Sequence, residues 1–120
     1  MISMKDYNSI YEKYAVNFLT ITSELLVANG FKLKGDKAYF SKYVYKDIDK
    51  LNITIQLSNN SYEMNVIDTD HDQIYYPFYF WDSGKNLELE EVSDNVAKVF
   101  KTFYKKGIFY DTQIQARKKY

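Results

Sequence analysis

The stretch LNITIQLSNNSYEMNVIDTDHDQIYYPFYFW, residues 51–81, decides the fold of this chain. It holds three segments rich in β-branched and aromatic residues, at about 51–57, 62–66 and 73–81, separated by runs of Asn, Ser and Asp. In the first two segments apolar and polar residues alternate, which is typical of a strand that buries one face, because successive side chains point to opposite sides. The polar runs consist of turn formers, so the stretch predicts three strands of an antiparallel meander.

The third segment is apolar on both faces and contains Pro77, which has no N–H to donate to a neighbouring strand. We therefore expect this strand to lie at an edge of the sheet, to bulge, or to end at the proline. Two further strands are expected upstream, at 31–34 and 37–45, although the alternation in the second is poor. Six lysines between residues 32 and 50 would protect an exposed edge strand against pairing with another chain.

Two amphipathic helices are predicted to flank the sheet. Apolar residues recur at helical spacing from Tyr7 to Leu26, and Gly30 stands just beyond them, where a left-handed C-terminal position favours glycine. This pattern predicts a helix at about 4–29. A second helix is expected at about 87–106, with glutamates near its start and lysines near its end, which is the order that the helix dipole favours.

The sequence therefore predicts a single α+β domain over residues 1–120. Its elements are an N-terminal helix, an antiparallel meander of about five strands and a C-terminal helix. We expect both helices to pack on one face of the sheet, which leaves the other face open. Residues 112–120 are polar and end in RKKY, so they are expected to form a frayed basic tail.

The composition narrows the class of protein. The chain has no Cys, so it has no disulfides and no thiolate metal sites, which fits a reducing compartment. No basic and apolar leader begins it, and no apolar run approaches the roughly 20 residues that span a bilayer. We expect a soluble, cytoplasmic protein with no membrane partner.

The net charge of zero hides a segregation of charge along the chain. Residues 51–95 hold nine acidic residues against one base, whereas residues 96–120 hold seven bases against one acid. Such segregation favours opposed charged patches on the surface. Part of it has a structural cause, because the second helix places its acids and bases to suit its dipole.

The run Asp68-Thr69-Asp70-His71-Asp72 is the most conspicuous polar feature. It begins like a calcium-binding loop, but Gln73 replaces the glycine at position six and Tyr79 replaces the glutamate at position twelve. We therefore predict no metal site there. Two interpretations are left: a solvated hairpin turn, and an acidic loop that docks on a basic partner together with nearby acids.

Nothing in the sequence predicts a cofactor or a catalytic centre. His71 is the only histidine and has no nucleophile motif beside it, and the four glycines are too scattered for a phosphate-binding loop. Paired carboxylates cannot be told from ordinary surface acids. We therefore expect a protein that is not an enzyme, with no cofactor.

Aromatic residues are abundant, with 13 Tyr, 8 Phe and 1 Trp among 120 residues. If the helices cover one face of the sheet, several tyrosines must lie on the other face. Tyrosine suits a binding surface because it offers area at low entropic cost and a polar group. The alternative is that an AT-rich genome raises Tyr, Lys, Asn and Ile together.

The leading hypothesis is a non-enzymatic protein-binding module, such as an inhibitor or immunity-type accessory protein of a bacterium or its mobile elements. Its partner would be a protein with a basic surface. The alternatives are a homodimer formed through the open sheet face, and an enzyme with a pocket between sheet and helices. Binding of nucleic acid ranks last, because acids border the central strands. The predicted contact residues are Glu63, Asp68, Asp70, Asp72, Tyr75, Tyr76, Tyr79 and Asp82.

Overall fold

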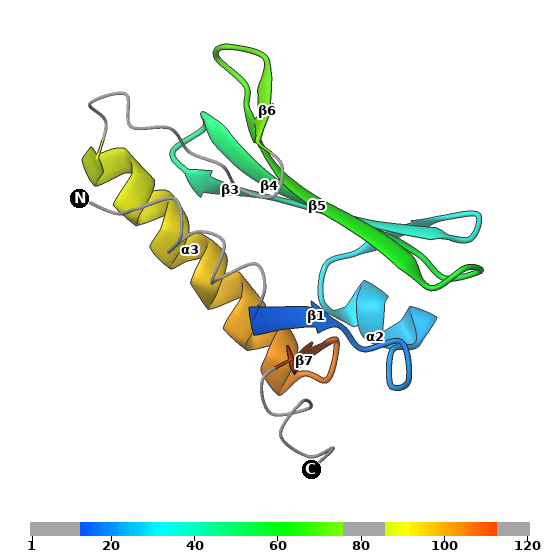
Figure 1. Cartoon of the computed structure of the whole chain (residues 1–120). Coiled ribbons are helices and arrows are strands. Elements are labelled where there is room, and N and C mark those ends of the chain that lie inside the picture. The colour runs from blue at the N-terminus through cyan, green and yellow to red at the C-terminus, as the bar shows by residue number, and fades with distance from the viewer. Residues whose placement is uncertain (1–12, 76–85, 113–120) are drawn as a thin grey trace.

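The computed structural model describes residues 13–75 and 86–112 of the chain (Figure 1). Two helices and seven strands are described, in an α+β arrangement. In chain order they are β1 (Tyr14–Val16), α2 (Ser23–Ala28), β2 (Lys32–Lys34), β3 (Lys37–Tyr45), β4 (Asp49–Gln56), β5 (Ser61–Asp68), β6 (Gln73–Tyr75), α3 (Asn86–Lys105) and β7 (Phe109–Asp111). Among the described residues, no helix combines the length and the apolar character needed to cross a membrane.

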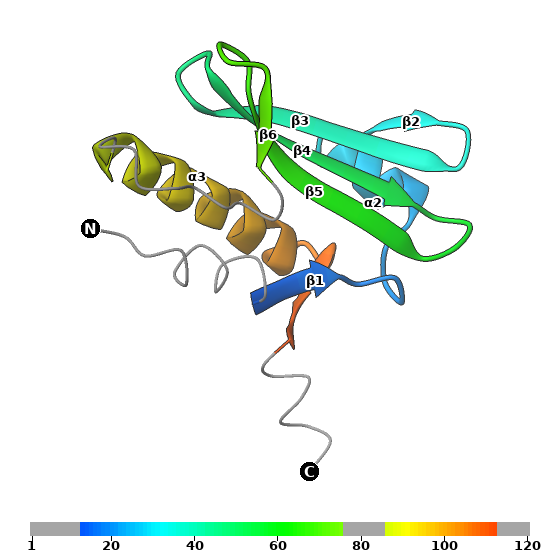
Figure 2. The same cartoon turned by 45° about the horizontal axis from the view of Figure 1, so that its top comes forward.

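The predicted five-stranded antiparallel meander is confirmed. Strands β2 to β6 lie side by side in chain order, and each pairs antiparallel with the next (Figure 2). In the described part of the chain, strand β6 lies at the edge of the sheet. This is one of the three outcomes expected for the segment that contains Pro77. An irregularity between Tyr43 and Tyr45 shifts the register of β3 against β4, and both Val44 and Tyr45 are buried there.

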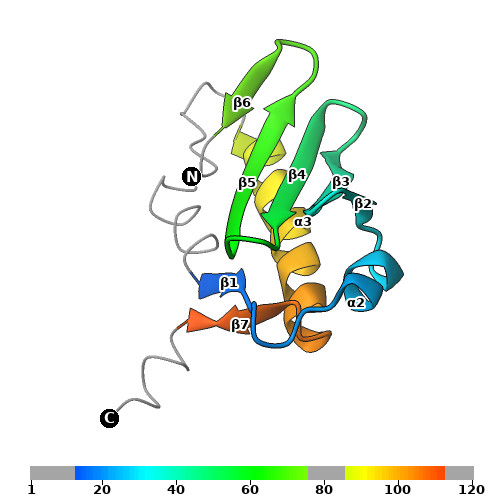
Figure 3. The same ribbon diagram turned by 90° about the vertical axis from the view of Figure 1, so that its right-hand side faces the viewer.

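Both helices and the small β1–β7 pair lie on one side of this sheet (Figures 1 and 3). The alternating apolar residues of the two central strands face this layer and are buried: Leu51, Ile53 and Ile55 of β4, and Met64 and Val66 of β5. We call this side of the sheet the inner face and the opposite side the outer face. None of the described elements covers the outer face.

The prediction of one continuous helix at 4–29 is wrong in the part that the structure describes. Residues 4–12 lie outside the described residues. The chain forms the short strand β1, then a turn, and only then the six-residue helix α2. Strand β1 pairs with β7, so partners far along the chain override the local helical spacing. The turn follows from capping: the Asn17 side chain accepts from the Leu19 N–H at 3.2 Å, and the Thr22 hydroxyl accepts from the Leu25 N–H at 3.0 Å.

The second helix agrees with its expected range, since α3 covers Asn86–Lys105 where about 87–106 was predicted. It is not the last element, because the following residues form β7. Two glycines take the left-handed conformation just past a helix, as expected: Gly30 has φ 95° and Gly107 has φ 84°. Of the predicted basic tail, residues 113–120 lie outside the described residues.

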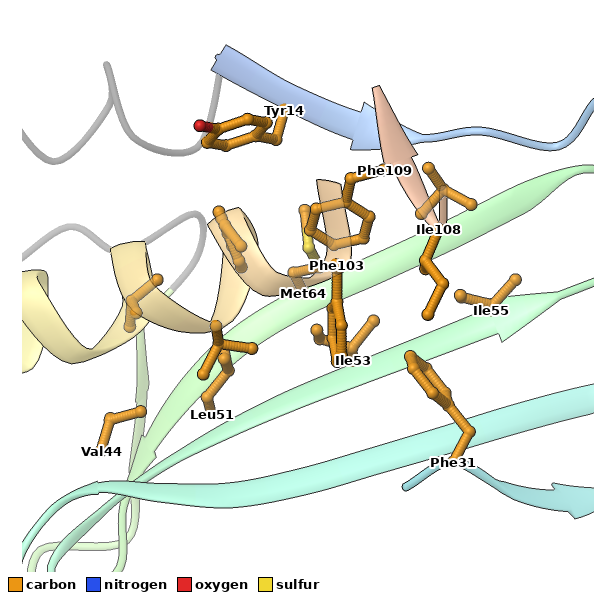
Figure 4. Packing of buried hydrophobic residues seen from close by; sticks show 14 of the residues in the cluster. Tyr14, Phe31, Val44, Leu51, Ile53, Ile55, Met64, Phe103, Ile108 and Phe109 are labelled. Atoms are coloured by element: carbon orange, nitrogen blue, oxygen red, sulfur yellow. The ribbon is translucent and has the colours of Figure 1, made fainter. Parts of the chain in front are cut away.

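The core between α3 and the inner face is built around the ring of Phe103 (Figure 4). This ring lies 5.5 Å from Phe31, 5.0 Å from Phe40 and 5.5 Å from Phe109, measured between ring centroids. Two of these three contacts are edge-to-face, the geometry that aromatic quadrupoles favour. Phe103 therefore joins α3 to the sheet, to the loop after α2 and to β7.

Replacing Phe103 by Ala should lower the free energy of unfolding by about 3–5 kcal/mol, because it empties this centre of the core. Urea denaturation measures the change. Lys101→Ala is the matched control on the exposed side of the same helix, and it should shift stability by less than about 0.5 kcal/mol. Equal effects of the two substitutions would contradict the assignment.

Candidate functional site

Two hairpin turns meet at one end of the sheet. The turn between β3 and β4 contains Asp47 and Ile48, and the turn between β5 and β6 begins at Thr69. The Thr69 N–H donates to the Ile48 carbonyl at 2.8 Å, and the Thr69 hydroxyl donates to the carbonyls of Ile48 at 2.9 Å and Asp47 at 3.2 Å. We call these two turns together the acidic end of the sheet.

Asp68 builds the second of these turns. Its residue surface is only 7% exposed. One carboxylate oxygen accepts from the N–H groups of Asp70 at 3.0 Å and His71 at 3.1 Å, and the other lies 2.8 Å from the His71 ring nitrogen Nδ1. Burial raises the pKa of Asp68, but the bonds from His71 and Asp70 outweigh it, and the pKa lies below the ordinary value for Asp. This carboxylate is committed to the turn itself.

The other predicted contact residues are scattered by the fold. Asp70 and Asp72 are exposed on the turn. Glu63 is also exposed, but it lies on the outer face five residues before Asp68, about 17 Å along the strand. The expected cluster of Glu63 with the acidic turn is therefore not found. Tyr75 is the last residue of β6, opposite Val66. The remaining predicted contacts, Tyr76, Tyr79 and Asp82, lie outside the described residues.

The register of four strands lines up three apolar side chains and one lysine across the outer face, a set of residues that the sequence did not predict. Tyr43 pairs with Lys50, Lys50 with Ile67, and Ile67 with Ile74, across β3, β4, β5 and β6. Tyr43 is 47% exposed and Ile74 is 50% exposed. The Lys50 ammonium lies 5.2 Å from the centre of the Tyr43 ring, a cation–π contact. We call these four residues the outer row.

The outer row lies beside the acidic end. Tyr43 stands three residues before Lys46, which opens the first turn, and Ile74 stands two residues after Asp72 in the second turn. Exposed apolar area and exposed carboxylates therefore share one end of the sheet. This end of the sheet therefore offers another molecule exposed apolar side chains bordered by negative charge.

The described residues give this end no metal site and no catalytic set. Within residues 13–75 and 86–112, no group of three or more His, Asp or Glu side chains could hold a metal ion. His71 and Asp68 form a histidine–carboxylate pair, and a catalytic triad also needs a nucleophile on the other ring nitrogen. In the described part of the chain, the His71 ring bonds to the Asp68 carboxylate through Nδ1.

Comparison with known proteins adds information on the fold. No family model matches the chain, and no curated protein matches it. The chain is similar to the crystal structure of a DUF1831 family protein from Lactobacillus plantarum. The TM-score is 0.62 with 18% sequence identity, over 81% of this chain and 84% of that chain. At this identity, the likeness shows a shared fold and nothing about activity.

Replacing Asp68 by Ala should lower the free energy of unfolding at neutral pH by roughly 1–3 kcal/mol, because the partly buried N–H groups of Asp70 and His71 lose their charged acceptor. Since the folded pKa of Asp68 is lowered, its contribution is present above the unfolded pKa of about 3.9 and is lost as the pH falls through the folded pKa. The variant should therefore lose less stability than the wild type on acidification below about pH 4.

Urea denaturation across a pH series measures both effects. Asp70→Ala is the matched control, because Asp70 is exposed on the same turn and keeps its backbone N–H bond. A control variant with the same loss of stability and the same flattened pH profile as Asp68→Ala would contradict the role given to Asp68.

Proposed function

We propose that this protein is a non-enzymatic protein-binding module that docks through the outer row and the acidic end of the sheet onto a partner with a basic surface. The observation that carries the proposal is the position of the outer row: exposed apolar side chains stand in register on a sheet face that no described element covers. Contiguous exposed apolar residues rimmed by polar ones mark interaction surfaces.

Charge supports the choice of a basic partner. Residues 43–50 and 67–74, which form this end of the sheet, contain five aspartates against two lysines. The two lysines are engaged locally, since Lys46 lies 5.0 Å from the Tyr45 ring centre and Lys50 lies 5.2 Å from that of Tyr43. Exposed carboxylates steer a basic partner toward the site, whereas the aromatic and aliphatic row supplies the buried contact.

An inhibitor or immunity-type role is a form of this proposal. Such proteins need a small, preformed contact surface and fast association, and rigidity lowers the entropic cost of binding. Here the two turns are fixed to each other by Thr69, whose N–H and hydroxyl donate to carbonyls of the first turn. The surface therefore needs no rearrangement of its backbone before it binds. We propose a cytoplasmic protein as the target of this inhibitor or immunity-type role.

A homodimer is the second candidate, and the opposite end of the outer face favours it. Lys32 of β2 pairs with Tyr39 of β3, and Lys34 of β2 pairs with Lys37 of β3, so three lysines lie at that end of the outer face. Two copies placed face to face about a two-fold axis, with their strands running in opposite directions, would set these lysines against the acidic end of the other copy. Such an arrangement is isologous, as most homodimers are.

The double variant Tyr43→Ser with Ile74→Ser tests the proposal. A protein captured by the wild type from cell extract should be lost or bound at least tenfold more weakly, because both exposed anchors are removed. Leu19→Ser with Val27→Ser is the matched control, since these exposed apolar residues lie in and near α2. A partner held equally by both double variants would overturn the assignment of the surface.

Charge reversal tests the steering. The double variant Asp47→Lys with Asp70→Lys should slow association with that partner and flatten its dependence on salt. Unchanged association rates would remove the acidic end from the proposal. Sedimentation of the wild type decides the second candidate: a dimer that dissociates in the Tyr43→Ser, Ile74→Ser variant supports it, and a monomer at high concentration excludes it.

A further inference from the structure

A cavity lies between the C-terminal half of α3 and strand β3, on the inner side of the sheet. Its volume is about 230 Å³. This is below the roughly 300–1,000 Å³ of pockets for drug-sized ligands, so only a small molecule would fit. The cavity is lined by Asn29, Phe40, Lys42, Lys98, Val99, Thr102 and Phe103.

The floor of the cavity is apolar and rigid. Val99 and Phe103 of α3 are 6% and 3% exposed, and the half-buried Phe40 of β3 completes the floor. The rings of Phe40 and Phe103 lie 5.0 Å apart and nearly perpendicular, at 79°. Both rings belong to the central aromatic cluster, so this surface exists before any ligand arrives. Flat apolar groups pack well on such surfaces.

The rim of the cavity is basic. Lys42 comes from β3 and Lys98 from α3, so positive charge stands on two different walls. In residues 13–75 and 86–112, neither ammonium lies within 4.0 Å of an acidic side chain, and even Asp94, one helical turn before Lys98, forms no such pair. Among the residues that the structure describes, the lining of the cavity contains no acidic residue. Two like charges around one small cavity repel each other, and an anion between them removes that cost.

Hydrogen-bonding groups accompany the two lysines. The Asn29 amide nitrogen uses one N–H on the Leu25 carbonyl at 2.8 Å, which fixes the side chain and leaves its second N–H to donate. The Thr102 hydroxyl donates to the Lys98 carbonyl at 2.9 Å, which fixes its oxygen beside the rim. The free N–H of the amide therefore adds orientation to the charge of the lysines, whereas the Thr102 hydroxyl has its one proton engaged and only lines the rim.

We propose that this cavity binds a small organic anion. Its carboxylate or phosphate group lies between Lys42 and Lys98 and accepts from Asn29, while its flat apolar part packs on Phe40 and Phe103. The site is separate from the outer row, because Lys42 precedes Tyr43 on β3 and neighbouring strand residues point to opposite faces. The proposal therefore stands whether or not the outer row docks a protein.

Titration of the full-length, isotope-labelled protein by two-dimensional NMR tests the site, with benzoate, phenyl phosphate, inorganic phosphate and benzyl alcohol as probes. Benzoate or phenyl phosphate should give saturable shifts at Asn29, Lys42, Lys98 and Thr102, and the tighter of the two identifies the anionic group. Benzyl alcohol, which has the ring without the charge, should not bind. Equal binding by benzyl alcohol would overturn the role of the lysines.

Lys42→Met and Lys98→Met should each weaken binding of the better probe by roughly tenfold, since each removes one charged hydrogen-bond donor. Lys101→Met is the matched control, because Lys101 is exposed on α3 and does not line the cavity. A control variant that weakens binding as much as Lys98→Met, or shifts that never saturate in the wild type, would overturn the proposal. Equal affinity for inorganic phosphate and phenyl phosphate would overturn the role of the aromatic floor.

Discussion

Burial of one face of a strongly alternating sheet is the constraint on which the rest of the structure depends. Leu51, Ile53 and Ile55 of β4 leave no accessible surface, and the aromatic ring of Phe103 packs into the same core. A sheet with one such face must be covered on that side, and α2, α3 and the β1–β7 pair provide the cover. The other side is then free to carry tyrosine, lysine and isoleucine, which is where the outer row lies.

The part of the fold that follows local rules was predictable from the sequence. Period-two alternation in residues 51–66 and helical spacing in 87–106 each predict the element that forms, because burial of one face imposes the period. The helix expected at 4–29 was wrong in residues 14–22 for two reasons that spacing does not reveal. The Asn17 side chain stabilises a turn and the Thr22 side chain caps α2, so the helix begins late, and β1 pairs with β7 at the far end of the described chain.

Only the negative charge of the candidate site was predictable from the sequence. The acidic run predicts a turn, and the turn forms, but which aspartate faces inward depends on the buried position of Asp68 at the end of β5. The outer row requires the register of three successive strand pairs, and the poor alternation of residues 37–45 gave no sign that Tyr43 would face outward. The cavity depends on tertiary packing alone, since Lys42 and Lys98 are far apart in sequence.

The pairing of β1 with β7 has a consequence for how the protein is made. The Thr112 hydroxyl donates to the Lys13 carbonyl across 99 residues, and the Asn17 N–H donates to the Ile108 carbonyl at 2.8 Å. The hairpins of the meander, by contrast, join neighbouring segments and close quickly. During synthesis the meander can therefore form while the apolar inner face of the sheet is still not fully covered. The cover of that side is complete only after α3 and residues 109–111 have been made and β7 meets β1.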